Sequence, residues 1–274
     1  MLMFICKGSV FLYVVSSLFY FSALWSRRKS LSKVGTFVLG TGFVLHTVGI
    51  VWRSVEISGL PITSLHGALS FFSWCIIAVF IIVQGKHHVG GMGIVVAPIS
   101  AILSVIATAC ESPDLPVKHE IGGYWLIVHG ILSFAGEAVL ALAFAAGLLY
   151  LIQESRIKKK VGSFGRGLPS LEALDELNYR CLGLGFPLLT GGIITGSIWA
   201  SDLWGSYWSW DPKETWSLVT WLIYAALLHQ RLNVGWRGKR AAIMAILGFL
   251  FVIVTFIGVN LVLPGLHSFR SFLG

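Results

Sequence analysis

The chain has 274 residues, of which 56% are hydrophobic and only 12% carry a charged side chain. A soluble domain carries roughly twice that charged fraction, so this composition, with a mean hydropathy of +0.82, excludes an ordinary soluble protein. The four cysteines form no C-x-x-C pair, which argues against a thioredoxin-like or zinc-ribbon site. Cys6 and Cys110 can both face an oxidising side and could pair there, but four free thiols are the simpler expectation.

We expect an all-α integral membrane protein with about eight transmembrane helices, because apolar runs long enough to cross a bilayer recur along the chain. In chain order they cover residues 9–25, 36–52, 66–83, 91–109, 124–152, 179–200, 213–229 and 241–263. Little chain is left between them, so residues 1–274 are expected to form a single polytopic membrane domain. The first run has no obvious cleavage site and is followed by four basic residues, which indicates a retained helix.

The basic residues predict the orientation of these helices. If both termini lie on the non-cytoplasmic side, the cytoplasmic segments are 26–35, 84–90, 153–180 and 230–240. These segments hold 15 of the 20 lysines and arginines. Basic loops that face anionic lipid therefore account for the net charge of +8, and no nucleic-acid partner is needed to explain it.

The segment that indicates a function lies between the sixth and seventh runs, on the expected outer face. It reads Trp204-Gly205-Ser206-Tyr207-Trp208-Ser209-Trp210-Asp211-Pro212-Lys213-Glu214. Three indoles this close together give an aromatic surface suited to a flat conjugated ligand, whereas tryptophans of an interfacial belt are usually scattered over helix ends. Asp211, Pro212 and Glu214 match an N-cap, a first helical residue and a capping box, so Asp211 is first interpreted as structural.

Two histidines are expected at the same face. His129 lies about one and a half turns into the fifth helix, and His267 follows the Pro264-Gly265 end of the eighth helix. Neutral imidazole is a good iron ligand and haem iron has two axial positions, so the two histidines could hold a haem against the aromatic segment. For either histidine alone, a hydrogen-bonded residue at a helix end is the plainer interpretation.

Other ionisable residues inside the apolar runs are weaker candidates. His229 should lie roughly 26 Å down the seventh helix, near the cytoplasmic edge, as a functional residue or as a lipid-facing edge histidine. His46 and His66 are expected to be packing or hydrogen-bonding residues. Glu137 in the fifth helix marks a polar path or bonds a neighbouring helix, and both interpretations stay open.

These segments resemble the CcsA/ResC-type cytochrome c assembly proteins, the haem-handling membrane family named for its WWD motif. The motif W-G-x-x-W-x-W-D stands at residues 204–211. Other matching segments are 125–129, 168–172, 185–189, 198–200, 228–231 and 263–268. Relatives often carry a glutamate in the stretch that corresponds to 65–69, at Gly67 here, so any role of that glutamate is not carried over.

The resemblance implies a set of site residues. An external WWD segment, residues 201–215, would bind haem b, with His129 and His267 as the axial ligands of its iron. His229 would ligate a transmembrane haem in a site that a CcsB/ResB-type partner completes. The cofactor-binding residues implied are His129, His267, His229, Trp204, Trp208, Trp210 and Asp211; no catalytic side chain is assigned.

The function that the resemblance implies is cytochrome c maturation in the cytoplasmic or inner cell membrane. Haem would be carried to the non-cytoplasmic face and attached to the CXXCH motif of an apocytochrome c. The chain would be a subunit of a cytochrome c haem ligase, with a thioredoxin-like thiol reductant supplied from elsewhere. The alternatives are a haem-delivery or regulatory membrane protein without ligase activity and, less favoured, a b-type electron-transfer subunit.

Overall fold

The computed structural model describes residues 2–26, 28–87, 90–110, 123–160 and 168–258, and in these residues the chain forms eight α-helices and no β-strand. The helices are α1 (Leu2–Ser26), α2 (Lys29–Ile57), α3 (Leu65–His87), α4 (Gly93–Ala109), α5 (Tyr124–Lys158), α6 (Leu171–Trp204), α7 (Pro212–His229) and α8 (Lys239–Ile253). A short 3₁₀-helix (Gly90–Met92) precedes α4, and π-helical turns η2 (Gln230–Val234) and η3 (Val254–Gly258) follow α7 and α8. The predicted all-α class is confirmed in the described ranges.

Several helices are longer than the apolar runs that predicted them. Helix α6 begins at Leu171 rather than at residue 179, and α5 continues to Lys158 rather than ending at 152. Hydropathy detects only the apolar part of a helix, whereas polar residues can continue its backbone hydrogen bonds. The start of α6 has its own signal, because Ser170 Oγ accepts a hydrogen bond of 3.1 Å from the Ala173 N–H as an N-cap.

The helix lengths support a multi-pass membrane protein. In the described part of the chain, six helices are long and apolar enough to cross a bilayer, namely α1, α2, α3, α5, α6 and α8 with the turn that follows it. Helix α4 is a shorter apolar helix of 17 residues, and α7, with 18 residues, is not among the six. Eight crossings and the outer location of both termini therefore stay predictions.

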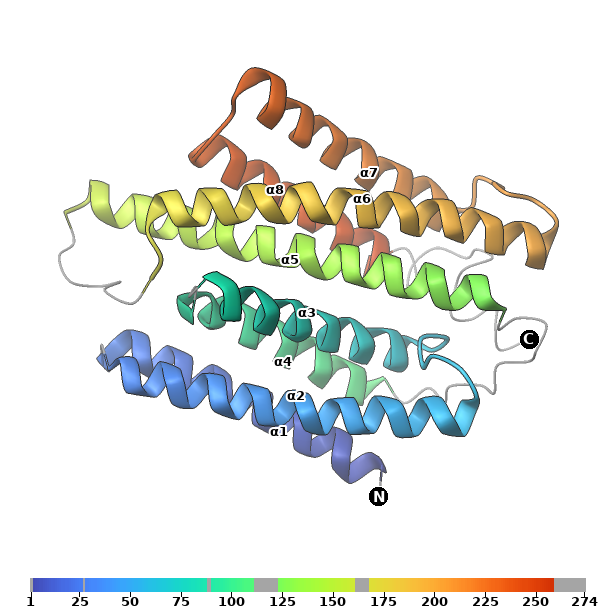
Figure 1. Cartoon of the computed structure of the whole chain (residues 1–274), viewed down its shortest axis with the longest axis horizontal. Coiled ribbons are helices and arrows are strands. Elements are labelled where there is room, and N and C mark those ends of the chain that lie inside the picture. Colours follow the sequence, from blue (N-terminus) through green and yellow to red (C-terminus); the bar gives the residue numbers. More distant parts are fainter. Residues whose placement is uncertain (1, 27, 88–89, 111–122, 161–167, 259–274) are drawn as a thin grey trace.

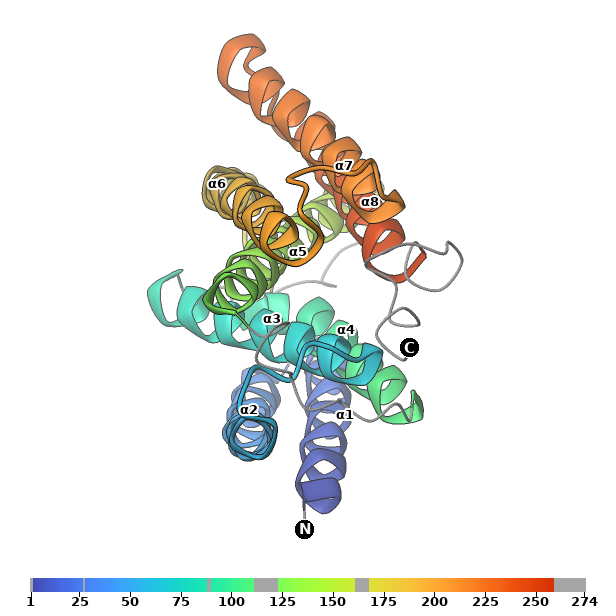
Figure 2. The same ribbon diagram turned by 90° about the vertical axis from the view of Figure 1, so that its right-hand side faces the viewer.

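The helices form two groups that lie side by side (Figures 1 and 2). Helices α1 to α4 make one group and α5 to α8 the other, with α3 nearest to α5. One end of the molecule gathers the last turns of α2 and α6 and the first turns of α3, α5 and α7 (Figure 1). We call this end the loop end, because it carries the aromatic loop, residues 205–211. We call the opposite end the basic end, because it carries the turn from α7 into α8, which contains Arg231 and Arg237.

Helices α5 and α6 pack closely because glycines stand at their contact points. A Cβ atom on Gly136 would lie 2.8 Å from the Leu189 backbone nitrogen, and one on Gly192 would lie 3.1 Å from the Ser133 Cα. Both distances are far below a normal van der Waals contact. Small residues at such positions let two membrane helices approach each other, since lipid offers no hydrophobic drive for their association.

Two histidines inside the α1–α4 group are hydrogen-bonded, as the sequence predicted. His46 is buried and its ring nitrogens lie 3.0 Å from the Tyr13 hydroxyl and 2.8 Å from the Ser70 hydroxyl. His66 Nδ1 donates to the Ala107 carbonyl oxygen over 2.7 Å. His46 thus links α1, α2 and α3, and His66 links α3 to α4. The thiols of Cys6, Cys75, Cys110 and Cys181 are free.

The basic end is held together by a buried ion pair. Arg231 in η2 donates two hydrogen bonds of 2.7 Å to the Asp175 carboxylate of α6, and the two side chains are only 5% and 18% exposed. The Gly238 N–H, just before α8, also donates to Asp175 over 2.7 Å. A single carboxylate therefore fixes α6, the π-helical turn and the start of α8.

We predict that Arg231→Met destabilises the protein by about 3 kcal/mol, because Arg231 is buried and its loss leaves the partly buried Asp175 carboxylate without two charge-assisted hydrogen bonds. The matched control is Arg180→Met, which breaks the exposed Arg180–Glu176 pair on the same helix as Asp175 and should cost under about 0.5 kcal/mol. Thermal unfolding in detergent measures both. Equal unfolding temperatures for the two variants would contradict the assigned role of Arg231.

Candidate functional site

The aromatic loop begins where α6 ends at Trp204. Gly205 follows in the left-handed region with φ of 73°, and its N–H donates to the Ser201 carbonyl. Trp210 also has a positive φ, 59°, which is unusual for a residue with a bulky side chain. The loop thus turns the chain from α6 into α7 within seven residues.

The predicted capping box at the loop exit is confirmed. Asp211 accepts a hydrogen bond of 2.9 Å from the Lys213 N–H, and the Glu214 carboxylate accepts from the N–H groups of Asp211 and Ser209 at 3.2 and 2.8 Å. Pro212 occupies the first helical position. Asp211 is only 7% exposed, so the structure gives it the N-cap role that the sequence suggested.

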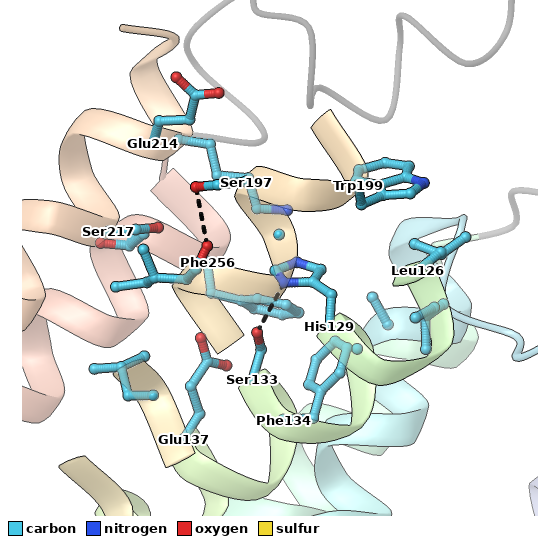
Figure 3. A pocket seen from close by; sticks show the side chains of 18 of the residues that line it. Leu126, His129, Ser133, Phe134, Glu137, Ser197, Trp199, Glu214, Ser217 and Phe256 are labelled. Carbon is cyan, nitrogen blue, oxygen red and sulfur yellow. Dashed lines mark hydrogen bonds between the residues drawn. The ribbon is translucent and has the colours of Figure 1, made fainter. Parts of the chain in front are cut away.

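His129 lies on α5 with a defined tautomer. Its Nδ1 is 2.7 Å from the carbonyl oxygen of Gly192 in α6 and 3.4 Å from the hydroxyl of Ser133, the contact that is dashed in Figure 3. A carbonyl oxygen can only accept, so Nδ1 carries the proton and donates it to Gly192, which leaves the lone pair of Nε2 available. Iron-ligating and zinc-ligating histidines commonly show this arrangement, in which the second ring nitrogen donates to a fixed acceptor.

The tryptophans around His129 form two edge-to-face pairs. The indole of Trp199, at the end of α6, stacks on the His129 ring with centroids 6.3 Å apart and planes at 9°, and Trp204 packs edge-on against Trp199 at 5.3 Å. In the loop, Trp208 packs edge-on against Trp210 at 5.9 Å. Trp199 has no assigned role in the sequence analysis, because its contact with His129 joins two helices and follows no local pattern.

A cavity at the loop end joins these elements. It is lined by residues of the loop, α3, α5, α6, α7 and η3, among them His129, Trp199, Trp208, Glu137 and Lys213. Figure 3 shows the His129 ring and the Glu137 carboxylate inside it, with Ser133 between them on the same face of α5. The remaining wall is mostly apolar, with Phe134, Leu189, Ile193 and Phe256. The cavity is therefore an aromatic and aliphatic pocket with a few converging polar groups, as ligand sites usually are.

The sequence-predicted site residues are only partly brought together. His129 and Trp208 line the cavity, and Trp204 reaches His129 through Trp199. Trp210 is 70% exposed and points away from the interior. His267 lies outside the described residues, so its convergence with His129 stays a prediction.

His229 lies far from this cavity, at the other end of α7 and therefore at the basic end (Figure 1). Its ring is exposed, and its Nδ1 is 2.8 Å from the side-chain amide of Asn233 in η2. The buried Arg231–Asp175 pair fixes the turn directly after it. His129 and His229 consequently belong to two separate locations, as the sequence predicted.

The residues at the cavity fit one side of a haem. His129 Nε2 offers a neutral imidazole lone pair to iron, and Trp199 and Trp208 offer aromatic surface to a macrocycle. The cavity volume, about 150 Å³, is smaller than that of a pocket that buries a whole ligand of that size.

Comparison with known proteins identifies the family to which the chain belongs. The family profile of cytochrome c assembly proteins matches residues 62–267. The chain is 32% identical to the cytochrome c biogenesis protein CcsA of Mesostigma viride, over 98% of this chain and 97% of that protein. It is also 32% identical to CcsA of Gloeobacter violaceus (94% and 92% covered) and 35% identical to CcsA of Guillardia theta (81% of each).

A solved structure shares the fold. The cytochrome c heme lyase CcmF superposes with a TM-score of 0.69 at 15% sequence identity, over 99% of this chain and 48% of CcmF. The present chain thus spans about half the length of CcmF, and the likeness concerns the fold alone. The family profile, which matches residues 62–267, and the first two CcsA relatives, which match 98% and 94% of the chain, show that it belongs to the cytochrome c assembly protein family, among its CcsA-type members.

Proposed function

We propose that the chain binds haem b at the loop end of the bundle and presents it, on the non-cytoplasmic side of the membrane, for attachment to the CXXCH motif of an apocytochrome c. The observation that carries this proposal is the free Nε2 lone pair of His129, fixed by the Gly192 carbonyl in a cavity beside the aromatic loop. Family membership supports the general role in cytochrome c maturation. Attachment at the non-cytoplasmic face, with His267 as second axial ligand, is our proposal.

The shape of the site suits presentation better than storage. A cavity too small to enclose a macrocycle leaves part of the ligand accessible from the loop. Thioether formation requires that accessibility, because each cysteine thiol adds across a vinyl C=C bond, forming one S–C bond and one C–H bond. The addition consumes no oxidant, but the thiols must be reduced beforehand, which we assign to a thioredoxin-like reductant on another protein. This chain supplies position, through His129, Trp199 and the aromatic loop.

The exposed His229 supports a second haem location that another chain completes. The His229 ring is exposed at the end of α7, and the Arg231–Asp175 pair fixes the turn that follows it. The ring is therefore available to a neighbouring protein. We propose that a CcsB/ResB-type membrane partner supplies the opposite ligand there. An ionisable side chain placed on a membrane helix usually marks such a functional site.

We predict that the purified chain binds haem and that His129→Ala weakens haem binding at least about tenfold, equivalent to about 1.4 kcal/mol. Added imidazole should restore the absorption spectrum, since it replaces the lost ligand. The matched control is His66→Ala. His66 also donates Nδ1 to a backbone carbonyl, but it does not line the cavity, so its loss should leave the spectrum unchanged. Unaltered haem binding in His129→Ala would refute the proposed site.

We predict that Gly196→Ala disturbs haem binding without removing any ligand. A Cβ atom there would lie 2.7 Å from His129 Nδ1, so the ring must move and lose its hydrogen bond to Gly192. Gly183→Ala on the same helix is the control, because its Cβ would meet no heavy atom within 4 Å. Haem titration should show weaker binding and an altered spectrum for the first variant only. Identical titrations for both would show that the ring orientation is unimportant.

We predict that co-expression with a CcsB/ResB-type partner and a CXXCH apocytochrome yields covalently bound haem. His129→Ala, His267→Ala and His229→Ala should each lower the yield at least about tenfold, because each removes an iron ligand. The product is measured by haem staining of denatured cytochrome. If the wild-type pair binds haem but forms no covalent product, the chain is a haem-delivery or regulatory protein instead.

A further inference from the structure

The cavity below His129 contains a carboxylate that haem ligation does not use. Glu137 lies two helical turns after His129 on the same face of α5, and its side chain points into the cavity (Figure 3). Its Oε2 atom is buried and has no hydrogen-bond partner in the described part of the chain. A carboxylate among Phe134, Leu189 and Phe256 is costly unless a positive charge compensates it.

Lys213 supplies that positive charge. Among the described residues that line the cavity, Lys213 is the single lysine, and there is no arginine. Lys213 and Glu137 line the same cavity, from α7 and from α5, and opposite charges in a mostly apolar cavity attract each other more strongly than in water. Lys213 therefore stands between α5 and the N-cap of α7.

The place of Lys213 in the chain makes this interaction consequential. Lys213 is in the first turn of α7, directly after the aromatic loop, and its N–H donates to the Asp211 side chain over 2.9 Å. The capping box fixes the loop to the start of α7. An attraction between Lys213 and Glu137 then fixes the start of α7 to α5, the helix that carries His129.

We propose that the opposite charges of Glu137 and Lys213 attract each other across the cavity and so hold the aromatic loop in position over His129. Glu137 is thus a positioning residue of the haem site. This inference rests on the proposed haem binding for its functional part, while the attraction itself can be tested without haem. Because α5 carries both His129 and Glu137, the distance between the iron ligand and the anchor of the loop is fixed by one helix.

The test is a double-mutant cycle with Glu137→Gln, Lys213→Met and the double variant. Each single change removes one side of the attraction, so each should lower the unfolding temperature of the haem-free protein and weaken haem binding by about tenfold. The unfolding temperature and the haem affinity of the double variant should be no lower than those of the more affected single variant. Lys213→Arg keeps the positive charge, so this variant should bind haem as tightly as the wild type. Glu154→Gln, which breaks the exposed pair with Lys158 on the same helix, is the control and should change neither quantity.

Three outcomes would overturn the proposal. If the two tenfold losses of haem affinity multiply to about a hundredfold loss in the double variant, the two residues act independently. Wild-type unfolding temperatures in both single variants would show that no such attraction exists. Coupling in the unfolding temperature with an unchanged haem spectrum and affinity would show that the pair does not position the site. If the wild-type chain binds no haem, the proposed function fails, but the unfolding measurements still decide whether the attraction exists.

Discussion

The close packing of α5 against α6 is the constraint on which the candidate site depends. Glycines at positions 136, 192 and 196 remove the side chains that would hold the two helices apart. Only at that separation does the Gly192 carbonyl lie 2.7 Å from His129 Nδ1. This hydrogen bond selects the tautomer with a free Nε2, and the stacking of Trp199 fixes the ring plane. The chemistry of one imidazole is thus determined by backbone contact between two helices.

The two ends of α7 carry different kinds of stabilisation. At the loop end, the capping box satisfies free backbone N–H groups, so local hydrogen bonds define where the helix begins. At the basic end, the Arg231–Asp175 pair connects residues 56 positions apart in the chain. The first device can form within a few residues, whereas the second requires that α6 and α7 are already packed. A single helix thereby joins the aromatic loop at one end to the exposed His229 at the other.

Local signals in the sequence predicted local structure well. The capping box at Asp211 and Glu214, the start of α5 at Tyr124 and the eight helices of the described ranges follow from residue types at fixed spacing. The helix bounds were less accurate, because polar residues such as those of 171–178 continue a helix beyond its apolar part. The resemblance of the WWD motif pointed to the correct family, since its spacing is specific over several separate segments.

Contacts between segments that are distant in the chain could not be predicted from the sequence in this way. The partner of His129 is a backbone carbonyl, which every residue possesses, so no residue type marks Gly192 as the acceptor. Trp199 and Asp175 likewise gain their roles only when α5, α6 and the α7–α8 turn come together. The sequence left two interpretations of Glu137 open, because the cavity that it shares with Lys213 forms only when segments 76 residues apart in the chain come together.

The π-helical turn after α7 has a consequence for how this family can vary in length. A π-helical turn closes its hydrogen bonds one residue further along the chain than an α-helical turn. Deleting one residue from Gln230–Val234 would let the α-helix continue, and everything that follows would rotate by about 100° about its axis. The Gly238 N–H would then turn away from Asp175. The hydrogen bond between Gly238 and Asp175 therefore depends on the number of residues between His229 and α8, and not only on the side chains at those positions.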